Sequence, residues 1–249
     1  MKKINIYLSV AILVAVMFAC QNTSEQSQPS ENPTTNMEKA LVEKVLTAEE
    51  QAALTPDKVL EMLKEGNKRF MNSNLTARDH SAQVRNSTLA QYPKAIILSC
   101  VDSRVPVEDI FDRGIGDLFV ARVAGNFENA DMLGSMEFAC KVSGSKLILV
   151  MGHEHCGAVK AAIDDVKLGN ITEMLTNIKP AVALVTDYEG ERTSKNEDFV
   201  EMVCDKNVEK TISDIRALSP ILKEMEDNGE IKIAGAVYDM DTGEVVFLN

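Results

Sequence analysis

Two short polar clusters carry the side chains best suited to chemistry, Cys100–Arg104 (CVDSR) and Gly152–Gly157 (GHEHCG). Cys100, His153 and Cys156 could supply two sulfur ligands and one nitrogen ligand to a single metal ion. Thiolates combined with imidazole favour zinc, and three protein ligands leave an open fourth position, as in catalytic zinc sites. The alternative is structural: two buried thiols and a strand-end histidine satisfied by hydrogen bonds.

Each cluster directly follows an apolar segment that we expect to be a strand. Ala95–Ser99 (AIILS) precedes the first cluster and Lys146–Met151 (KLILVM) precedes the second. Wholly apolar runs of this length are typical of strands buried on both faces of a parallel sheet. Asp117–Val123 (DLFVARV) predicts a third strand. Open α/β sheets place their ligand sites beyond the carboxyl ends of such strands, where both clusters lie.

Helical segments alternate with these strands. Thr55 and Pro56 form an N-cap followed by proline at the first helical position, which predicts a helix ending near Met71. Further helices are expected over Met132–Val142, Gly157–Leu168, Ile171–Thr186 and Glu197–Leu218, and a hairpin over Ile231–Tyr238, Asp239–Gly243 and Glu244–Leu248. This alternation predicts an α/β fold with a central, mostly parallel β-sheet flanked by helices.

The N-terminal segment MKKINIYLSVAILVAVMFAC is typical of an export signal. Two lysines precede an apolar run over Val10–Phe18, and a small residue, Ala19, stands directly before Cys20. The tetrad Met17–Cys20 resembles a bacterial lipoprotein box, so we expect cleavage before Cys20 and lipid on its sulfur. The protein would then be an exported, periplasmic or cell-envelope lipoprotein that meets the membrane only through this anchor. The alternative is an uncleaved hydrophobic anchor.

The chain divides into three expected parts: a signal peptide over residues 1–19, a flexible tether over 20–46 and one catalytic domain over 47–249. Residues 21–39 contain no branched aliphatic or aromatic side chain, so they cannot form a core. The 249-residue chain has 38 acidic and 26 basic residues and a formal net charge of −12. That balance argues against a surface that grips nucleic acid by charge.

The remaining cysteines have structural explanations. Cys140 and Cys204 lie in apolar helical stretches and are expected to be buried thiols, with a disulfide between them as the alternative. The chain contains no C-x-x-C motif, which argues against a thiol-redox protein. His155, between two ligand candidates, is interpreted as a partly exposed bystander rather than a proton carrier.

The pattern C-x-D-x-R followed by H-x-x-C-G resembles the β-class carbonic anhydrases. Further segments that match this family in order are Val105-Pro106, Gly116–Val120, Arg122–Asn126, Gly134–Ala139 and Gly235–Asp239. The resemblance extends from roughly residue 50 to the C-terminus. It implies the β-carbonic anhydrase fold, one Zn²⁺ per chain, and reversible hydration of carbon dioxide to bicarbonate and a proton.

By this resemblance, Cys100, His153 and Cys156 hold zinc, and Arg104 pairs with Asp102 and holds it off the metal. A free carboxylate could become the fourth ligand, whereas a paired one leaves that position to a water molecule. The bound water then loses a proton and attacks carbon dioxide. Two thiolates give zinc more electron density than histidines do, so we expect activity that rises above neutral pH.

Five further positions match the family's substrate site. Gln91 would reach a neighbouring subunit's site and donate its amide to the substrate oxygen. The backbone N–H of Gly157 would face the bound anion. Phe119, Ala124 and Phe138 would line the apolar pocket for carbon dioxide, although some relatives carry other residues at the last two positions. Because Gln91 acts across subunits, the resemblance implies a homodimer or a higher even-numbered oligomer.

Two alternatives to carbon dioxide hydration stay open. The same zinc fold could act on carbonyl sulfide or carbon disulfide, or the protein could be a non-catalytic zinc-binding protein of the cell envelope. The charged pair Asp102 and Arg104, together with Gln91, argues against mere zinc storage, which needs none of them. Ile97 stands where a bicarbonate-regulated subgroup carries tryptophan, so we expect the open, water-bound resting site.

Overall fold

The computed structural model describes residues 40–248. The predicted signal peptide, the proposed lipid site at Cys20 and most of the predicted tether lie outside the described residues, so these assignments stay predictions. Within the described part, the backbone N–H of Val42 donates to the carbonyl of Ala77 at 2.9 Å, and the carbonyl of Val42 accepts from Asp79 at 3.1 Å. Across residues 40–248, no helix has the length and apolar character that a membrane span requires.

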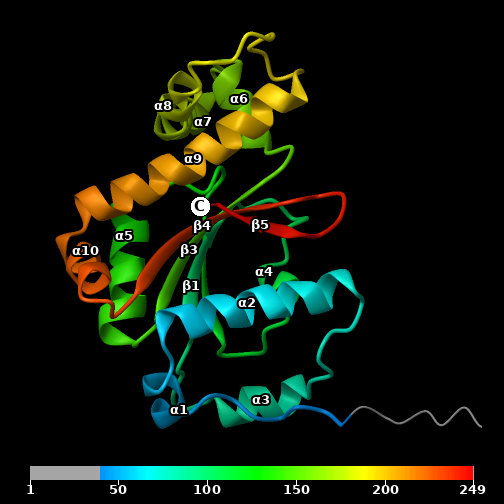
Figure 1. The fold of residues 1–249 in the computed structure, drawn as a ribbon, viewed down its shortest axis with the longest axis vertical. Helices are drawn as coiled ribbons and strands as arrows, with labels where there is room; N and C mark the ends of the chain where they lie inside the picture. The colour runs from blue at the N-terminus through cyan, green and yellow to red at the C-terminus, as the bar shows by residue number, and fades with distance from the viewer. Residues whose placement is uncertain (1–39, 249) are drawn as a thin grey trace, which may run out of the picture. The chain divides into compact units, whose positions relative to one another are not determined.

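A five-stranded sheet lies at the centre of the described domain (Figure 1). Its strands are β1 (Ala95–Ser99), β2 (Leu118–Arg122), β3 (Leu147–His153), β4 (Lys232–Tyr238) and β5 (Val245–Phe247). The spatial order is β2-β1-β3-β4-β5, with the first four parallel and β5 antiparallel to β4. The predicted α/β fold, its mostly parallel sheet and its C-terminal hairpin are therefore confirmed.

Helices cover both faces of the sheet, as the apolar runs predicted. Strands β1 and β3 are buried along their whole length. Ile97 and Leu149 point toward one helical layer, while their neighbours Ile96 and Ile148 point toward the other, because successive side chains of a strand alternate between faces. Strand β2, at the edge, is half-buried at all five positions.

The two helical layers differ in composition. One contains α2 (Pro56–Met71) and the short α4 (Val107–Ile110); the other contains α5 (Ala130–Glu137), α9 (Glu197–Leu218) and α10 (Pro220–Asp227) (Figure 1). A third apolar cluster lies beyond the carboxyl ends of the strands. It packs the first half of α9 against α6 (Gly157–Ile163), α7 (Gly169–Met174), the 3₁₀ turn η2 (Leu175–Asn177) and α8 (Lys179–Leu184). This cluster includes Cys100, Cys156 and Cys204.

The predicted bounds of α2 and α9 are confirmed, whereas other helices differ. The helix predicted over Gly157–Leu168 ends at Ile163, and the chain then turns through Asp165, whose φ of 52° lies in the left-handed region. The segment Ile171–Thr186 is divided: α7 ends at Met174, and α8 begins at Lys179, with Pro180 in its first turn. After Glu137, α5 continues as the π-helical turn η1 (Phe138–Val142).

Short helices were not predicted. These are α1 (Ala48–Ala52), α3 (His80–Asn86), α4 and α10. Three of the four nevertheless have side-chain caps: Thr47 caps α1 in a capping box with Glu50, Asp79 caps α3, and Ser219 caps α10.

Cys140 and Cys204 are buried and free. The buried-thiol prediction is confirmed, and the alternative of a disulfide between them is wrong.

Candidate metal centre

Three side chains of metal-ligand type meet at the carboxyl ends of the central strands. Cys100 directly follows β1, and His153 is the last residue of β3. Because β1 and β3 are parallel neighbours, with Ser99 paired to Met151, the chain brings Cys100 and His153 to the same edge. Cys156, the N-cap of α6, completes the group. The ligand atoms of the three residues lie within 4.8 Å of one another, and all three side chains are buried.

The hydrogen bonds of His153 leave one ring nitrogen available. Its Nδ1 lies 2.8 Å from the backbone carbonyl of Glu154, so Nδ1 carries the proton and donates it. Its Nε2 is buried and has no hydrogen-bond partner among the residues that the structure describes. A buried lone pair without a partner is costly unless a ligand uses it. A neutral imidazole beside two thiols fits the donor set of zinc.

The two cysteines of the group are already coupled. A hydrogen bond from the Cys156 thiol lowers the pKa of Cys100, and the same contact, together with burial, raises the pKa of Cys156. The backbone N–H of Gly125 also donates to Cys100 Sγ, at 3.3 Å. The pair therefore favours one thiolate, which is the form of cysteine that binds metals.

Asp102 and Arg104 form a close pair beside this group. Arg104 donates from Nε to Asp102 Oδ1 at 2.9 Å and from Nη2 to Oδ2 at 2.8 Å, and its backbone N–H donates to Oδ1 at 2.9 Å. These bonds hold the pKa of Asp102 well below its usual range. Oδ2 of Asp102 lies 3.9 Å from His153 Nε2. The carboxylate is thus ionised and next to the group, with both oxygens engaged by Arg104.

Arg122, at the end of β2, binds the loop that contains Asp102 and Arg104 through hydrogen bonds on both sides of the pair. Its Nη1 donates to the carbonyl of Cys100 at 2.8 Å, and its Nη2 donates to the carbonyl of Val105 at 2.6 Å. In the sequence, Arg122 stood out only as part of the matched segment Arg122–Asn126. Its charged side chain near the end of the predicted strand Asp117–Val123 was the signal that could have identified it.

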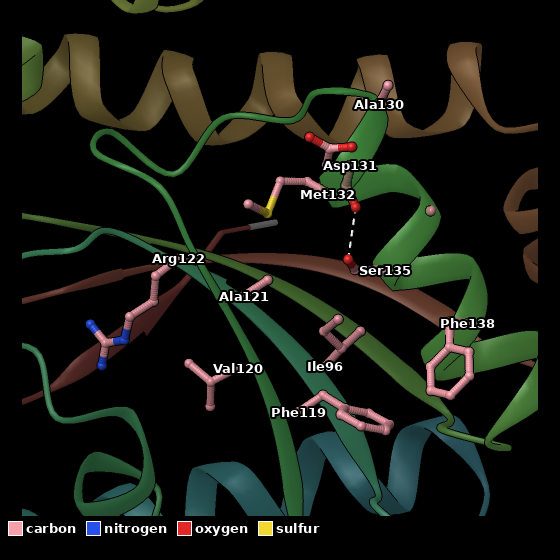
Figure 2. Close-up of a pocket in the computed structure, with 11 residues that line it drawn as sticks. Ile96, Phe119, Val120, Ala121, Arg122, Ala130, Asp131, Met132, Ser135 and Phe138 are labelled. Atoms are coloured by element: carbon pink, nitrogen blue, oxygen red, sulfur yellow. Dashed lines mark hydrogen bonds between the residues drawn. The ribbon is translucent and has the colours of Figure 1, made fainter. Parts of the chain in front are cut away.

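The predicted substrate residues are only partly brought together. The rings of Phe119 and Phe138 have centroids 6.2 Å apart and planes at 69°, and both line a groove of about 780 Å³ between β2 and α5 (Figure 2). Phe138 is 51% exposed. Ala124 is half-buried and follows β2, outside the groove's lining, and Gly157 is the exposed first residue of α6.

Gln91 lies apart from the ligand group within its own chain. It is exposed in the loop between α3 and β1 and lines a separate shallow pocket with Leu89 and Ile115. Its predicted action in a neighbouring subunit stays a prediction.

Residues around the ligands include two that the sequence analysis did not connect to the site. Cys204 Sγ, on α9, donates to the carbonyl of His153 at 3.5 Å. Asn207, three residues later, donates from Nδ2 to the carbonyl of Gly125 at 2.8 Å. A buried amide on the mostly apolar inner face of α9 was the available signal. His155 is partly exposed, as predicted, with Nδ1 3.9 Å from Glu197 Oε1, and its interpretation as a bystander stays a prediction.

Comparisons with known proteins agree on the kind of protein that this chain resembles. The family model described as carbonic anhydrase matches residues 95–245. The chain is 37% identical over 192 residues to carbonic anhydrase 2 of Mycobacterium tuberculosis (strain CDC 1551 / Oshkosh), which covers 74% of this chain and 88% of the relative.

Solved structures extend the likeness to the fold. The β-carbonic anhydrase CcaA matches with a TM-score of 0.62 and 25% identity, over 78% of this chain and 94% of that one. The structure of tetrameric β-carbonic anhydrases from the ascomycete Sordaria macrospora shares the fold, with a TM-score of 0.58 and 22% identity over 74% of this chain and 91% of that one.

Proposed function

Because the chain belongs to the β-carbonic anhydrase family, we propose that it hydrates carbon dioxide reversibly at a zinc ion held by Cys100, His153 and Cys156. The observation that carries the proposal is the Nε2 of His153, which is buried and without a described partner. It belongs to a group of ligand atoms within 4.8 Å of one another that includes two thiols. The products are bicarbonate and a proton.

Zinc bound by this group would supply Lewis-acid activation of water at a pH near neutral. Asp102 contributes a hydrogen-bond acceptor, because Arg104 keeps its carboxylate ionised and engages both oxygens. A carboxylate fixed in this way can accept from the O–H of the attacking water and orient its lone pair toward carbon. The same pairing keeps Asp102 from becoming a fourth metal ligand.

For the substrate, we propose an apolar surface from Phe119, Phe138 and Ala124 and anion contact by the N–H of Gly157. Gln91 of a second copy would donate its amide N–H to a substrate oxygen. A complete site then requires a homodimer or a higher even-numbered oligomer. The tetrameric relatives from Sordaria macrospora support this assembly.

We also propose that the enzyme works outside the cytoplasm. The segment before Cys20 has the charged, apolar and small-residue order of an export signal, and lipid on Cys20 would attach residues 47–249 to a membrane through the tether.

Zinc content and activity, measured together, test the proposed reaction. The purified wild-type enzyme is expected to hold one zinc per chain and to hydrate carbon dioxide in a stopped-flow assay. Chelation should abolish the activity, and added zinc should restore it. Cys156→Ala should lose both zinc and activity, whereas the matched variant Cys140→Ala, which removes a buried thiol elsewhere in the core, should retain both.

Three outcomes would contradict the proposal. Full activity after complete zinc removal would exclude the metal's role. One bound zinc per chain without carbon dioxide hydration would favour a zinc-binding protein of the envelope. Rapid hydrolysis of carbonyl sulfide, with negligible turnover of carbon dioxide in the same preparation, would assign the site to the sulfur substrate.

A further inference from the structure

Asn207 lies in the middle of α9 and is only 1% exposed. Its Nδ2 donates to the carbonyl of Gly125 at 2.8 Å, across 82 residues of sequence. Its Oδ1 has no hydrogen-bond partner among residues 40–248. Within the described residues, the side chain of Asn207 therefore makes its hydrogen bond to the carbonyl of Gly125.

Gly125 in turn contacts a proposed metal ligand. Its backbone N–H donates to Cys100 Sγ at 3.3 Å. The turn that presents this N–H is closed by a bond from the N–H of Asn126 to the carbonyl of Val123 at 3.0 Å. Gly125 has a φ of +86°, and a Cβ on it would lie 2.3 Å from Ile178 Cδ1. The position thus requires glycine, whose backbone is the least restricted of all residues, so its direction depends on the hydrogen bonds that hold it.

We propose that Asn207 is a positioning residue of the metal centre. By holding the carbonyl of Gly125, it fixes the turn so that the Gly125 N–H points at the Cys100 sulfur. An N–H donor to a thiolate stabilises its negative charge and the orientation of the ligand. Partners of this kind typically contribute about 10–100-fold to metal affinity. The inference rests on the proposed zinc site. It adds to that site a residue of α9, a helix that supplies none of the three proposed ligands.

Thr211 supplies a matched control on the same helix. It lies one turn beyond Asn207, is 0% exposed, and its hydroxyl has no partner in the described part of the chain. Thr211→Val changes a buried polar group on α9 to an apolar one of the same shape. Asn207→Leu does the same at the position that contacts Gly125.

The test measures zinc affinity by competition with a chromophoric chelator, and the thiolate-to-metal absorption band after cobalt(II) replaces zinc. Asn207→Leu is expected to bind zinc about 10-fold or more weakly and to shift the cobalt band, because the Gly125 N–H is then no longer held toward the Cys100 sulfur. Thr211→Val should match the wild type in both. Thermal unfolding of each metal-free variant shows whether the fold is retained.

A second measurement on the wild type covers the case in which Asn207→Leu fails to fold. In ¹⁵N-labelled protein loaded with ¹¹³Cd, the Gly125 amide proton should show a scalar coupling to the metal through the N–H···S bond. Absence of that coupling would overturn the inference, as would wild-type affinity and spectrum in Asn207→Leu or an equal loss in Thr211→Val. A wild type that binds no zinc would instead contradict the proposed function.

Discussion

At the scale of single residues, His153 illustrates how a backbone acceptor decides what a side chain can bind. Its Nδ1 proton is used by the carbonyl of Glu154, so the second nitrogen has only a lone pair to offer. The sequence could suggest His153 as a ligand by its spacing from Cys156. The structure adds the tautomer, which depends on the path of the chain immediately after β3.

Within residues 40–248, the two cysteines outside the metal centre are Cys140 and Cys204, and both should be chemically inert in the folded enzyme. Burial raises the pKa of both thiols to about 12, so at pH 8 only about one part in 10⁴ of each would be the reactive thiolate. Zinc-loaded protein treated with iodoacetamide at pH 8 and digested for mass spectrometry should show both residues unmodified.

The same protein unfolded in denaturant with a chelator is the control, and there Cys140 and Cys204 should both be alkylated. Modification of Cys140 or Cys204 in the folded, zinc-loaded enzyme would contradict the burial that the structure assigns to them.

At the scale of elements, the approach of α2 to the segment after α4 is set by one glycine. A Cβ on Gly66 would lie 1.9 Å from the carbonyl oxygen of Phe111. Backbone atoms cannot yield as the end of a flexible side chain can, so any larger residue would push α2 away from the sheet. Phe111 is itself fully buried in the core under α2.

Gly66→Ala is therefore expected to destabilise the protein by about 3 kcal/mol, although alanine is the better helix former in isolation. Gly134→Ala in α5 is the contrast, since a Cβ there would meet no described atom within 4 Å. It should stabilise the protein by about 0.5–1 kcal/mol. Urea unfolding measures the free energy of unfolding of each variant, which should fall for Gly66→Ala and rise for Gly134→Ala. A Gly66→Ala protein as stable as the wild type would refute the close approach.

The elements also show what the sequence could predict. Strands β1 and β3 were predictable because burial on both faces leaves an unbroken apolar run, and α2 and α9 because each is long enough to show helical periodicity. Helices α1, α3, α4 and α10 have only four to eight residues, too few to establish a period. The π-helical turn η1 forms the end of the helix predicted over Met132–Val142, and a helical sequence pattern does not distinguish such a turn from an α-helical one.

The residues of the site also differ in how far the sequence could predict them. Cys100, His153 and Cys156 were predictable because residue type and strand-end position are both visible in the sequence. The contact of Asn207 with Gly125 was not, because it depends on how α9 crosses the strand ends. Nor could spacing show that Gln91 would lie away from its own chain's ligands.

At the scale of the whole molecule, the proposed site is shared between copies, and this can be tested by complementation. Asp102→Ala and Gln91→Ala homo-oligomers should each lose activity, by about 100-fold or more for Asp102→Ala. Mixed after subunit exchange, they should recover about a quarter of wild-type activity, since half of random pairs are mixed and each mixed pair has one intact site.

The control applies the same subunit-exchange procedure to each variant alone, and neither variant should then regain activity. If the mixture also fails to recover while mass spectrometry shows mixed oligomers, Gln91 does not act across subunits. A fully active monomer on a sizing column would contradict the shared site directly.

The side-by-side pairing of β1 and β3 has a consequence for biosynthesis. Cys100 and His153 are brought together by the ladder between their strands, and closing so long a loop by a metal alone would cost chain entropy without compensation from buried apolar surface. The partner of Gly125 on α9 is synthesised later still. Metal loading is therefore expected to follow the pairing of β1 with β3, and a chain halted during synthesis before α9 would present the ligands without the helix whose Asn207 contacts Gly125.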